Sequence, residues 1–202
     1  NYLATRIDAL VQSQQLLLAN ASHELRTPLA RIRVGLDLLD SSDPSKGKNE
    51  IRKDINELNA IIDELILMAR LATGLGEEQR EPFDLLGLVP EECSRYPGCE
   101  FGGEAIEVLG DRRLVQHLIR NLVDNALTHG EAPVNVTVEQ NEGSATLKVS
   151  DGGNGISPDD AKGLLEPFRR GKDLQNIPGS GLGLTLVKKI ADAHKASFSM
   201  GG

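Results

Sequence analysis

Residues 18–39 read LANASHELRTPLARIRVGLDLL, and this stretch decides the first part of the fold. Its apolar side chains recur at alternating spacings of four and three residues, the heptad pattern of a helix that packs along one seam. After a break at residues 41–44 (Ser-Ser-Asp-Pro) the spacing returns, so two helices are predicted, the first over residues 3–40. The seam comprises Leu18, Ser22, Leu25, Leu29, Ile32, Leu36 and Leu39, then Ile51, Ile55, Leu58, Ile62, Leu65, Ala69 and Ala72.

The two predicted helices form a helical hairpin that cannot bury all of its apolar side chains by itself. One hairpin leaves much of its apolar seam uncovered, whereas a four-helix bundle built from residues 3–72 of two chains covers it. We therefore expect a homodimer through residues 3–72. The alternative is a monomeric hairpin packed against the rest of the chain.

The chain changes character after a polar, glycine-containing linker over residues 74–81, which separates a predicted domain over residues 1–73 from one over residues 82–202. Strands are predicted at residues 82–85, 105–109, 134–138 and 145–149, the last two as a hairpin. Helices are predicted over residues 86–96, from an N-cap at Asp111 to about Thr128, and over residues 180–194. Helices mixed with hairpin strands favour an α/β sandwich with helices on one face of the sheet.

The composition of the chain limits the classes of protein to which it can belong. The 202 residues suit one large or two small domains, and a net charge of -8 argues against a nucleic-acid-binding protein. No run of about 18 apolar residues predicts a membrane span, and no signal peptide is visible. The two cysteines, Cys93 and Cys99, are interpreted as reduced thiols of a cytosolic domain. The chain starts without Met, so we expect it to be a piece of a longer protein.

His23 is the candidate catalytic residue of the first domain. It follows Ser22 of the seam, so it flanks the buried stripe and is expected to face solvent. A neutral imidazole nitrogen accepts a phosphoryl group, and the carboxylate of Glu24 would hold the ring and take up its proton. Taken alone, the pair of His23 and Glu24 is better explained as an ordinary helix surface. A zinc site is excluded because no second His follows four residues later. Pro28 should bend the helix just after the histidine.

Four clusters in the second half are candidates for nucleotide binding. Asn121 and Asn125 share one helical face, and amide oxygens suit a hard cation such as Mg²⁺. Residues 151–155, Asp-Gly-Gly-Asn-Gly, follow a strand and allow a tight turn with a carboxylate beside it. Residues 166–170, Glu-Pro-Phe-Arg-Arg, combine an aromatic ring with two cations. Residues 179–184, Gly-Ser-Gly-Leu-Gly-Leu, open a helix whose free amides suit phosphate oxygens. Each cluster alone is also compatible with a surface coincidence or a plain turn.

The order of these motifs along the chain is more specific for one family than any single motif is. HELRTPL at residues 23–29, the paired asparagines, Asp-x-Gly-x-Gly, a Phe motif and Gly-x-Gly-Leu-Gly-Leu follow one another as the H, N, G1, F and G2 boxes do. The chain thus resembles the sensor histidine kinases of bacterial two-component systems over roughly residues 5–200. The resemblance implies a dimerising phospho-acceptor hairpin and an ATP-binding domain of the gyrase, Hsp90 and histidine kinase type, truncated at its C-terminus.

The resemblance implies a role for each matched residue. His23 would be the phospho-acceptor, Glu24 its general base, and Thr27 a positioner of water in the reverse, phosphatase reaction. Asn121 and Asn125 would hold Mg²⁺, and Asp151 would accept the adenine amino group. Residues 169–178 would form a mobile ATP lid. The remaining implied contacts with ATP are Gly153, Gly155, Phe168, Arg170, Gly179, Gly181, Leu182 and Gly183.

The resemblance further implies autophosphorylation from ATP, onward transfer to an aspartate of a response regulator, and a membrane anchor of the full-length protein in the bacterial inner membrane, outside this cytoplasmic segment. One departure is Thr128, because the family often has a basic residue there. Either Lys172 or Arg169 would compensate, or the chain would bind nucleotide weakly. Two alternatives remain: an adaptor that only docks a regulator, and a hydrolysing ATPase of the gyrase, Hsp90 and MutL type. The second is expected to carry Glu where this chain has Asn121.

Overall fold

The structure is a computed structural model that describes residues 2–39, 44–72, 79–141, 143–157, 161, 163–168 and 180–201. The chain divides into two compact units, Asn1–Leu67 and Met68–Gly202, and each is described by itself. Within the described ranges, every helix is too short or too polar to cross a membrane.

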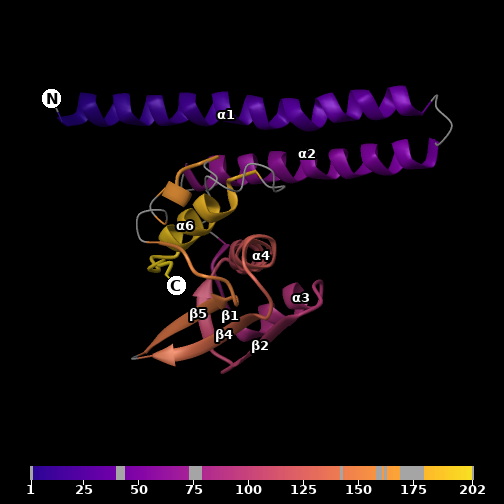
Figure 1. The fold of residues 1–202 in the computed structure, drawn as a ribbon. Coiled ribbons are helices and arrows are strands. Elements are labelled where there is room, and N and C mark those ends of the chain that lie inside the picture. The colour runs from indigo at the N-terminus through magenta and orange to yellow at the C-terminus, as the bar shows by residue number, and fades with distance from the viewer. Residues whose placement is uncertain are drawn as a thin grey trace. The chain divides into compact units, whose positions relative to one another are not determined.

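Two long helices build the first unit. Helix α1 spans Tyr2–Leu38 and continues through Pro28, and helix α2 spans Pro44–Ala72. The two lie side by side as an antiparallel hairpin (Figure 1). The predicted helical hairpin is therefore confirmed, with α2 beginning at Pro44, a residue whose fixed φ suits the first turn of a helix.

The helices of the hairpin touch along a stripe beside the predicted seam. Its buried members are spaced seven residues apart and are Ala21, Pro28 and Gly35 on α1 and Gly47, Asp54 and Ile61 on α2. A Cβ atom added to Gly35 would lie 2.7 Å from Ile51 Cγ1, so glycine lets the two helices approach closely. Apolar spacing did not reveal this stripe because glycine, proline and aspartate do not mark a hydrophobic face.

Part of the predicted seam is left open to solvent within one chain, while other members, such as Leu25, Ile32 and Ile51, are half-buried. Leu18 is 65% exposed, Leu29 54%, Leu36 52% and Ile55 44%. Side chains of this kind rarely line up on a surface that has no partner. An interhelical ion pair reinforces the hairpin at the buried stripe itself, where Arg31 Nε donates to Asp54 Oδ1 at 2.7 Å and the same guanidinium also pairs with Glu57.

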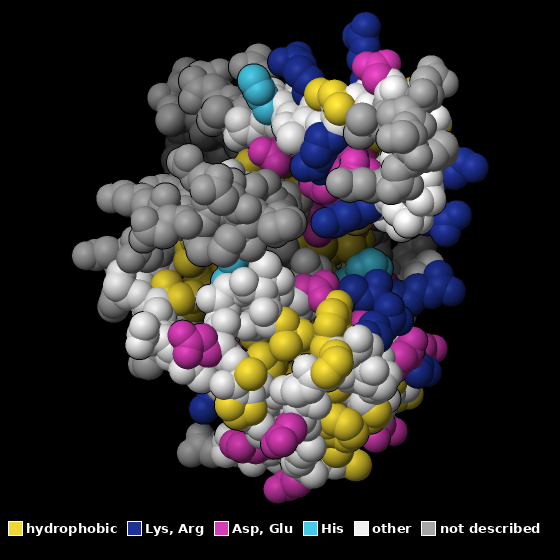
Figure 2. All heavy atoms as spheres, turned by 45° about the vertical axis from the view of Figure 1, so that its right-hand side comes forward, with side chains coloured by type: hydrophobic (Ala, Val, Ile, Leu, Met, Phe, Trp, Pro, Cys, Tyr) yellow, Lys and Arg dark blue, Asp and Glu magenta, His cyan; other side chains and the backbone are white. Residues whose placement is uncertain are grey.

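The strands of the second unit form two small sheets. Strand β1 (Glu81–Asp84) pairs antiparallel with β3 (Glu107–Gly110). The other sheet has the order β2-β4-β5. In it, β2 (Cys99–Gly103) runs parallel to β4 (Val134–Asn141), which forms an antiparallel hairpin with β5 (Ser144–Ser150). Over the strands, at the foot of the view in Figure 2, hydrophobic side chains are edged by acidic ones.

Among the described residues of this unit, three α-helices lie on one side of these strands (Figure 1). They are α3 (Val89–Cys93), preceded by the 3-10 helix η2 (Leu86–Leu88), then α4 (Arg112–His129) and α6 (Gly183–Ala193). Alternation along β4 turns Val134, Val136 and Val138 inward, where all three are fully buried. Ile119 of α4 belongs to the same hydrophobic core as Val136 and Val138, and Ile190 of α6 is also fully buried. The predicted α/β sandwich is thus confirmed.

One strand was missed by the sequence prediction. Strand β2 reads Cys-Glu-Phe-Gly-Gly and has no apolar alternation, so its strand conformation depends on pairing with β4. Gly103 at its end has φ of +123°, and a Cβ there would lie 2.0 Å from the Val138 carbonyl oxygen. Only glycine permits that approach. The last helix also begins later than predicted, at Gly183, because Gly181 has φ of +68°.

Candidate functional site

Helix α4 carries the paired asparagines, and its first turn is held from two sides. As predicted, Asp111 caps the helix: its Oδ1 accepts hydrogen bonds from the amides of Arg113 (2.9 Å) and Leu114 (3.2 Å). The amide of Asp111 in turn donates to His194 Nε2 at 2.9 Å. Since Nε2 accepts, the proton of the neutral ring lies on Nδ1, which is 2.8 Å from the Ile190 carbonyl oxygen. His194 therefore ties the start of α4 to the end of α6.

Asn121 faces the beginning of α6. Its Nδ2 donates to the His117 carbonyl at 2.9 Å, which orients the side-chain amide. The Oδ1 atom lies on the side of Gly183, where an added Cβ would come within 2.9 Å of it. The structure thus brings together the N-box asparagine and the glycine-rich helix start, two motifs that are about 60 residues apart in the sequence. Asn125, one turn after Asn121, is half-buried.

Gly183→Ala tests this close approach. The new methyl group would displace the Asn121 amide and break its bond to His117, a loss of about 0.5–1.5 kcal/mol for a neutral hydrogen bond. We expect the dissociation constant for ATP to rise roughly 3- to 10-fold. Isothermal titration calorimetry measures it. Gly102→Ala is the matched control, because nothing lies within 4 Å of its added Cβ, and an equal loss there would contradict the assignment.

Asp151 lies against the other end of α4. A Cβ added to Gly130, which ends this helix, would fall 2.5 Å from Asp151 Oδ1. The same oxygen accepts a hydrogen bond from the Gly153 amide at 2.8 Å, and the Gly152 amide donates to the Glu131 carbonyl at 2.6 Å. Asp151 is exposed, and Gly155 has φ of +73°, which favours glycine. The turn therefore presents an oriented carboxylate that suits an exocyclic amine.

The Phe motif is joined to the glycine-rich helix start by its backbone. The Phe168 amide donates to the Gly181 carbonyl at 2.9 Å, and Phe168 itself has φ of +62°. The buried hydroxyl of Thr185 donates to the Leu165 carbonyl at 3.0 Å. Leu182 is fully buried, so it contributes to the core that holds the loop. Arg170, Gly179 and the predicted lid over residues 169–178 lie outside the described residues, as do Arg169 and Lys172.

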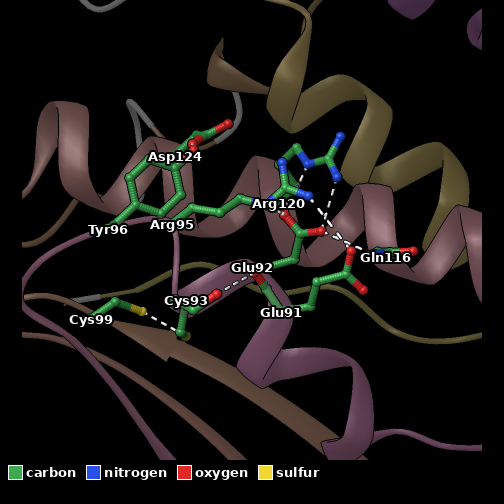
Figure 3. Close-up of polar contacts among 10 residues, drawn as sticks. Glu91, Glu92, Cys93, Arg95, Tyr96, Cys99, Gln116, Arg120 and Asp124 are labelled. Carbon is green, nitrogen blue, oxygen red and sulfur yellow. Dashed lines mark hydrogen bonds and ion pairs between the residues drawn. The ribbon is translucent and has the colours of Figure 1, made fainter.

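A second face of α4 is anchored on α3 by a buried carboxylate (Figure 3). Glu92 is fully buried and accepts from Arg120 Nε and Nη2, both at 2.9 Å, and from Gln116 Nε2 at 3.1 Å. Burial alone raises the pKa of Glu92, but the hydrogen bonds and charge of Arg120 outweigh it and bring the pKa below its usual range. The sequence showed no sign of this pair, because its members come from separate helices.

A second contact lies one turn further along α4 and involves Tyr96, in the turn that follows α3. The Tyr96 hydroxyl hydrogen-bonds Asp124, as Figure 3 shows. Burial, followed by this hydrogen bond, raises the pKa of Tyr96 to about 12. Arg120 and Asp124 directly precede Asn121 and Asn125 in the chain. The α3 contacts therefore set the rotation of α4 about its own axis, and with it the direction of both asparagines.

The phospho-acceptor candidates lie on α1 in the other unit. His23 is exposed, as predicted, and Glu24 beside it is half-buried. Thr27 is exposed one turn later, and its hydroxyl is 3.5 Å from the His23 carbonyl oxygen. Pro28 is buried against the hairpin interior. The imidazole is thus open to a reactant from solvent while the adjoining turn is held in place.

The donor chemistry of the N box suits magnesium that arrives with a nucleotide. Among the described residues, no cluster of three or more His, Cys, Asp or Glu side chains could hold a metal alone. The Asn121 amide, oriented by His117, offers an oxygen, and Mg²⁺ is commonly bound by one or two protein groups together with substrate phosphates. Asn121 and Asn125 therefore fit an ion shared with ATP.

An exposed histidine on a helical hairpin, with a separate α/β unit that gathers amide, carboxylate and glycine motifs, defines a protein with a phospho-acceptor and a nucleotide-binding part. Family models bear this out: residues 13–74 match the His Kinase A (phospho-acceptor) domain, and residues 110–201 match the histidine kinase-, DNA gyrase B- and HSP90-like ATPase. The chain belongs to the sensor histidine kinases, as its motif order predicted.

Curated relatives and solved structures agree. The chain is 32% identical over 216 residues to the sensor protein RstB of Escherichia coli, covering all of this chain and 47% of that protein. It is 28% identical over 215 residues to the sensor protein kinase PmrB of Pseudomonas aeruginosa, covering 45% of it. The chain thus spans about half the length of these relatives. Its fold is that of the Acinetobacter baumannii histidine kinase AdeS, with a TM-score of 0.70, 23% identity, and coverage of 85% of this chain and 86% of that one.

Proposed function

We propose that the chain is the catalytic core of a protein-histidine kinase that transfers the γ-phosphoryl group of ATP to His23. The main observation in support of this proposal is that Asn121 lies close to Gly183 at the start of α6, in a unit that matches the ATPase family model. An exposed histidine within the matched phospho-acceptor domain supplies the acceptor. A hydrolysing ATPase would have no use for the phospho-acceptor domain matched at residues 13–74.

The proposed step is an in-line displacement at phosphorus. An unprotonated ring nitrogen of His23 forms the new N–P bond while the bond between the γ-phosphorus and the β–γ bridging oxygen breaks, and ADP leaves. Glu24 takes up the proton carried by the other ring nitrogen. Asp151 would hold adenine through its exocyclic amine, and the Gly181–Gly183 segment would present amides to the phosphates. Mg²⁺, when bound with ATP at Asn121 and Asn125, would neutralise charge on the phosphates.

Incubation with γ-labelled ATP and Mg²⁺ tests the proposal. The label should become attached to the chain, be lost in acid and survive in base, as a phosphoramidate does. Mass spectrometry should locate it on His23. Release of labelled inorganic phosphate without a labelled chain would favour the hydrolysing ATPase, and ATP binding without either would favour the docking adaptor.

We propose further that the chain works as a homodimer through residues 3–72. The hairpin interior is already filled by the heptad stripe that includes Ala21, Gly35 and Ile61, yet several side chains of the predicted seam beside it stay exposed. The seam would be buried by the same seam of a second hairpin, because four helices enclose a continuous core where two cannot.

Leu29→Asp tests the dimer. Leu29 belongs to the seam and is 54% exposed in one chain, so a charge there is harmless to a monomer but costly at a buried interface. We expect light scattering to show a dimer for the unaltered chain at about 50 μM and a monomer for the variant. Val34→Asp is the matched control, since Val34 is 58% exposed but lies off the seam. A dimer unaffected by Leu29→Asp would place the interface elsewhere.

The phosphoryl group is proposed to pass from His23 to an aspartate of a response regulator. A solved histidine kinase of the same fold, ThkA, is in complex with the response regulator protein TrrA; the match has a TM-score of 0.69, 19% identity, and coverage of 96% of this chain and 59% of that one. We also propose that the whole protein is anchored in a membrane by segments beyond residues 1–202, as the resemblance implies.

Thr27→Ala separates the reverse reaction from the kinase reaction. Thr27 is exposed one turn from His23, where its hydroxyl can orient a water molecule at a bound phosphoaspartate. We expect autophosphorylation within about twofold of the unaltered chain but a roughly 10- to 100-fold slower loss of label from the regulator. Thr27→Ser should restore that rate, since it keeps the hydroxyl. Equal dephosphorylation by all three proteins would remove Thr27 from this role.

A further inference from the structure

The only two cysteines of the chain lie against each other. Cys93 ends α3 and Cys99 begins β2, and their Sγ atoms are 2.7 Å apart (Figure 3). Both are free thiols. Neither side chain belongs to the phospho-acceptor or nucleotide site described above.

The backbone between the thiols holds them together in the folded state. The Tyr96 amide donates to the Cys93 carbonyl at 3.0 Å, and the Cys99 amide donates to the Tyr96 carbonyl at 3.4 Å. Gly98 has φ of +86° and its carbonyl accepts from the Val134 amide at 3.2 Å, which attaches the turn to β4. A disulfide needs its sulfur atoms at about 2.05 Å, so closure requires only a small movement of the side chains.

The two thiols differ in access. Cys93 is 2% exposed within the core cluster, and burial, then the neighbouring Cys99 thiol, raises its pKa to about 12. Cys99 is half-buried and packs at the edge of that cluster. Because the thiolate is the reactive form and must meet the oxidant, Cys99 is the sulfur that reacts first and Cys93 is the one that resolves the product.

We propose that Cys93 and Cys99 form a reversible redox modification site, closed to an intramolecular disulfide by hydrogen peroxide or a similar two-electron oxidant. The Cys99 thiolate attacks one peroxide oxygen, the O–O bond breaks, and a sulfenic acid and hydroxide result. The Cys93 sulfur then attacks the Cys99 sulfur. The S–S bond forms, the S–O bond breaks, and the oxygen leaves as water with the Cys93 proton. In total, two thiols are oxidised and one peroxide is reduced to two waters.

The disulfide acts as a staple behind the nucleotide site. It joins the end of α3 to the first residue of an edge strand, and α4 is held by Glu92 of α3 and by Tyr96 in the turn that follows it. Because the sulfur atoms move little, the arrangement of Asn121 with Gly183 on the other contact face of α4 is retained. Oxidation therefore makes the second unit more resistant to opening while leaving its affinity for ATP unchanged.

Peroxide treatment of the full 202-residue chain tests the site. The folded chain should lose both free thiols and the mass of two hydrogen atoms, show no covalent dimer on a non-reducing gel, and recover both thiols with dithiothreitol. Hydrogen exchange of the α3 and β2 amides should slow roughly 10- to 50-fold, the effect expected for a closed loop of this size. The dissociation constant for ATP should stay within about twofold.

Two single variants keep the test decisive. In Cys93→Ala, Cys99 should stop at the sulfenic acid, which dimedone traps, and in Cys99→Ser the buried Cys93 should stay reduced. The site is disproved if the unaltered chain keeps both thiols under conditions that oxidise Cys99 in Cys93→Ala. It is equally disproved if the oxidised product is only an intermolecular dimer, or if oxidation weakens ATP binding more than about tenfold.

Discussion

Replacing His23 by alanine should abolish phosphorylation of the chain, whereas replacing Glu24 by alanine should only slow it. His23 is exposed on α1 and is the proposed acceptor, so its loss removes the nucleophile. Glu24 is the adjacent, half-buried carboxylate, and loss of general base catalysis costs about 10²- to 10⁴-fold in rate. Both variants should bind ATP with unchanged affinity, because the nucleotide-binding motifs lie in the unit Met68–Gly202.

Single-turnover labelling at saturating ATP measures both effects. Glu24→Gln is the informative companion, since it keeps the size and polarity of the side chain but cannot take a proton; it should be as slow as Glu24→Ala. A wild-type rate in Glu24→Ala would show that the carboxylate is only a helix surface residue. Acid-labile label retained by His23→Ala would mean that the acceptor is elsewhere and the proposed reaction is wrong.

Arg120→Ala should destabilise the second unit by about 3–5 kcal/mol, because it leaves the fully buried Glu92 carboxylate without its main partner. Hydrogen exchange of the α4 and β4 amides reports the opening of this unit alone, and it should accelerate roughly 10²- to 10⁴-fold. Arg95→Ala is the matched control. Arg95 also pairs with Glu92, at 3.5 Å, but is 46% exposed, so its loss should cost less than about 1 kcal/mol.

The effect of pH distinguishes a lost charge pair from a lost side chain. The pKa of Glu92 lies below its usual range in the folded unit, so the pair stabilises the fold above the ordinary pKa of about 4.5. That stability is lost as the pH falls through the lowered folded pKa. In Arg120→Ala, the effect of burial on Glu92 is no longer offset, so the pKa of Glu92 in the folded unit rises. Because the folded unit then takes up a proton more readily than the unfolded chain, the variant should become relatively more stable as the pH falls. Parallel pH profiles for the two proteins would contradict this assignment.

Motifs read along one element were predicted correctly from the sequence. Heptad spacing predicted the hairpin, an aspartate before an apolar helix predicted the Asp111 N-cap, and alternation predicted β4 with its hairpin partner. The order of the boxes predicted the family. The heptad spacing, the N-cap and the strand alternation are signals between residues close together in the chain, where backbone geometry sets the spacing.

Contacts between elements were decided only by the tertiary structure. Sequence spacing did not reveal that Gly35 lets α1 approach α2, that Gly183 meets Asn121, or that Gly130 makes room for Asp151. Strand β2 was missed because its conformation depends on pairing with β4 rather than on its own residues. Glu92 and Arg120 were missed as a pair for the same reason. Close approach and burial depend on how elements distant in the sequence pack together. The residues next to each of these positions in the chain do not reveal that packing.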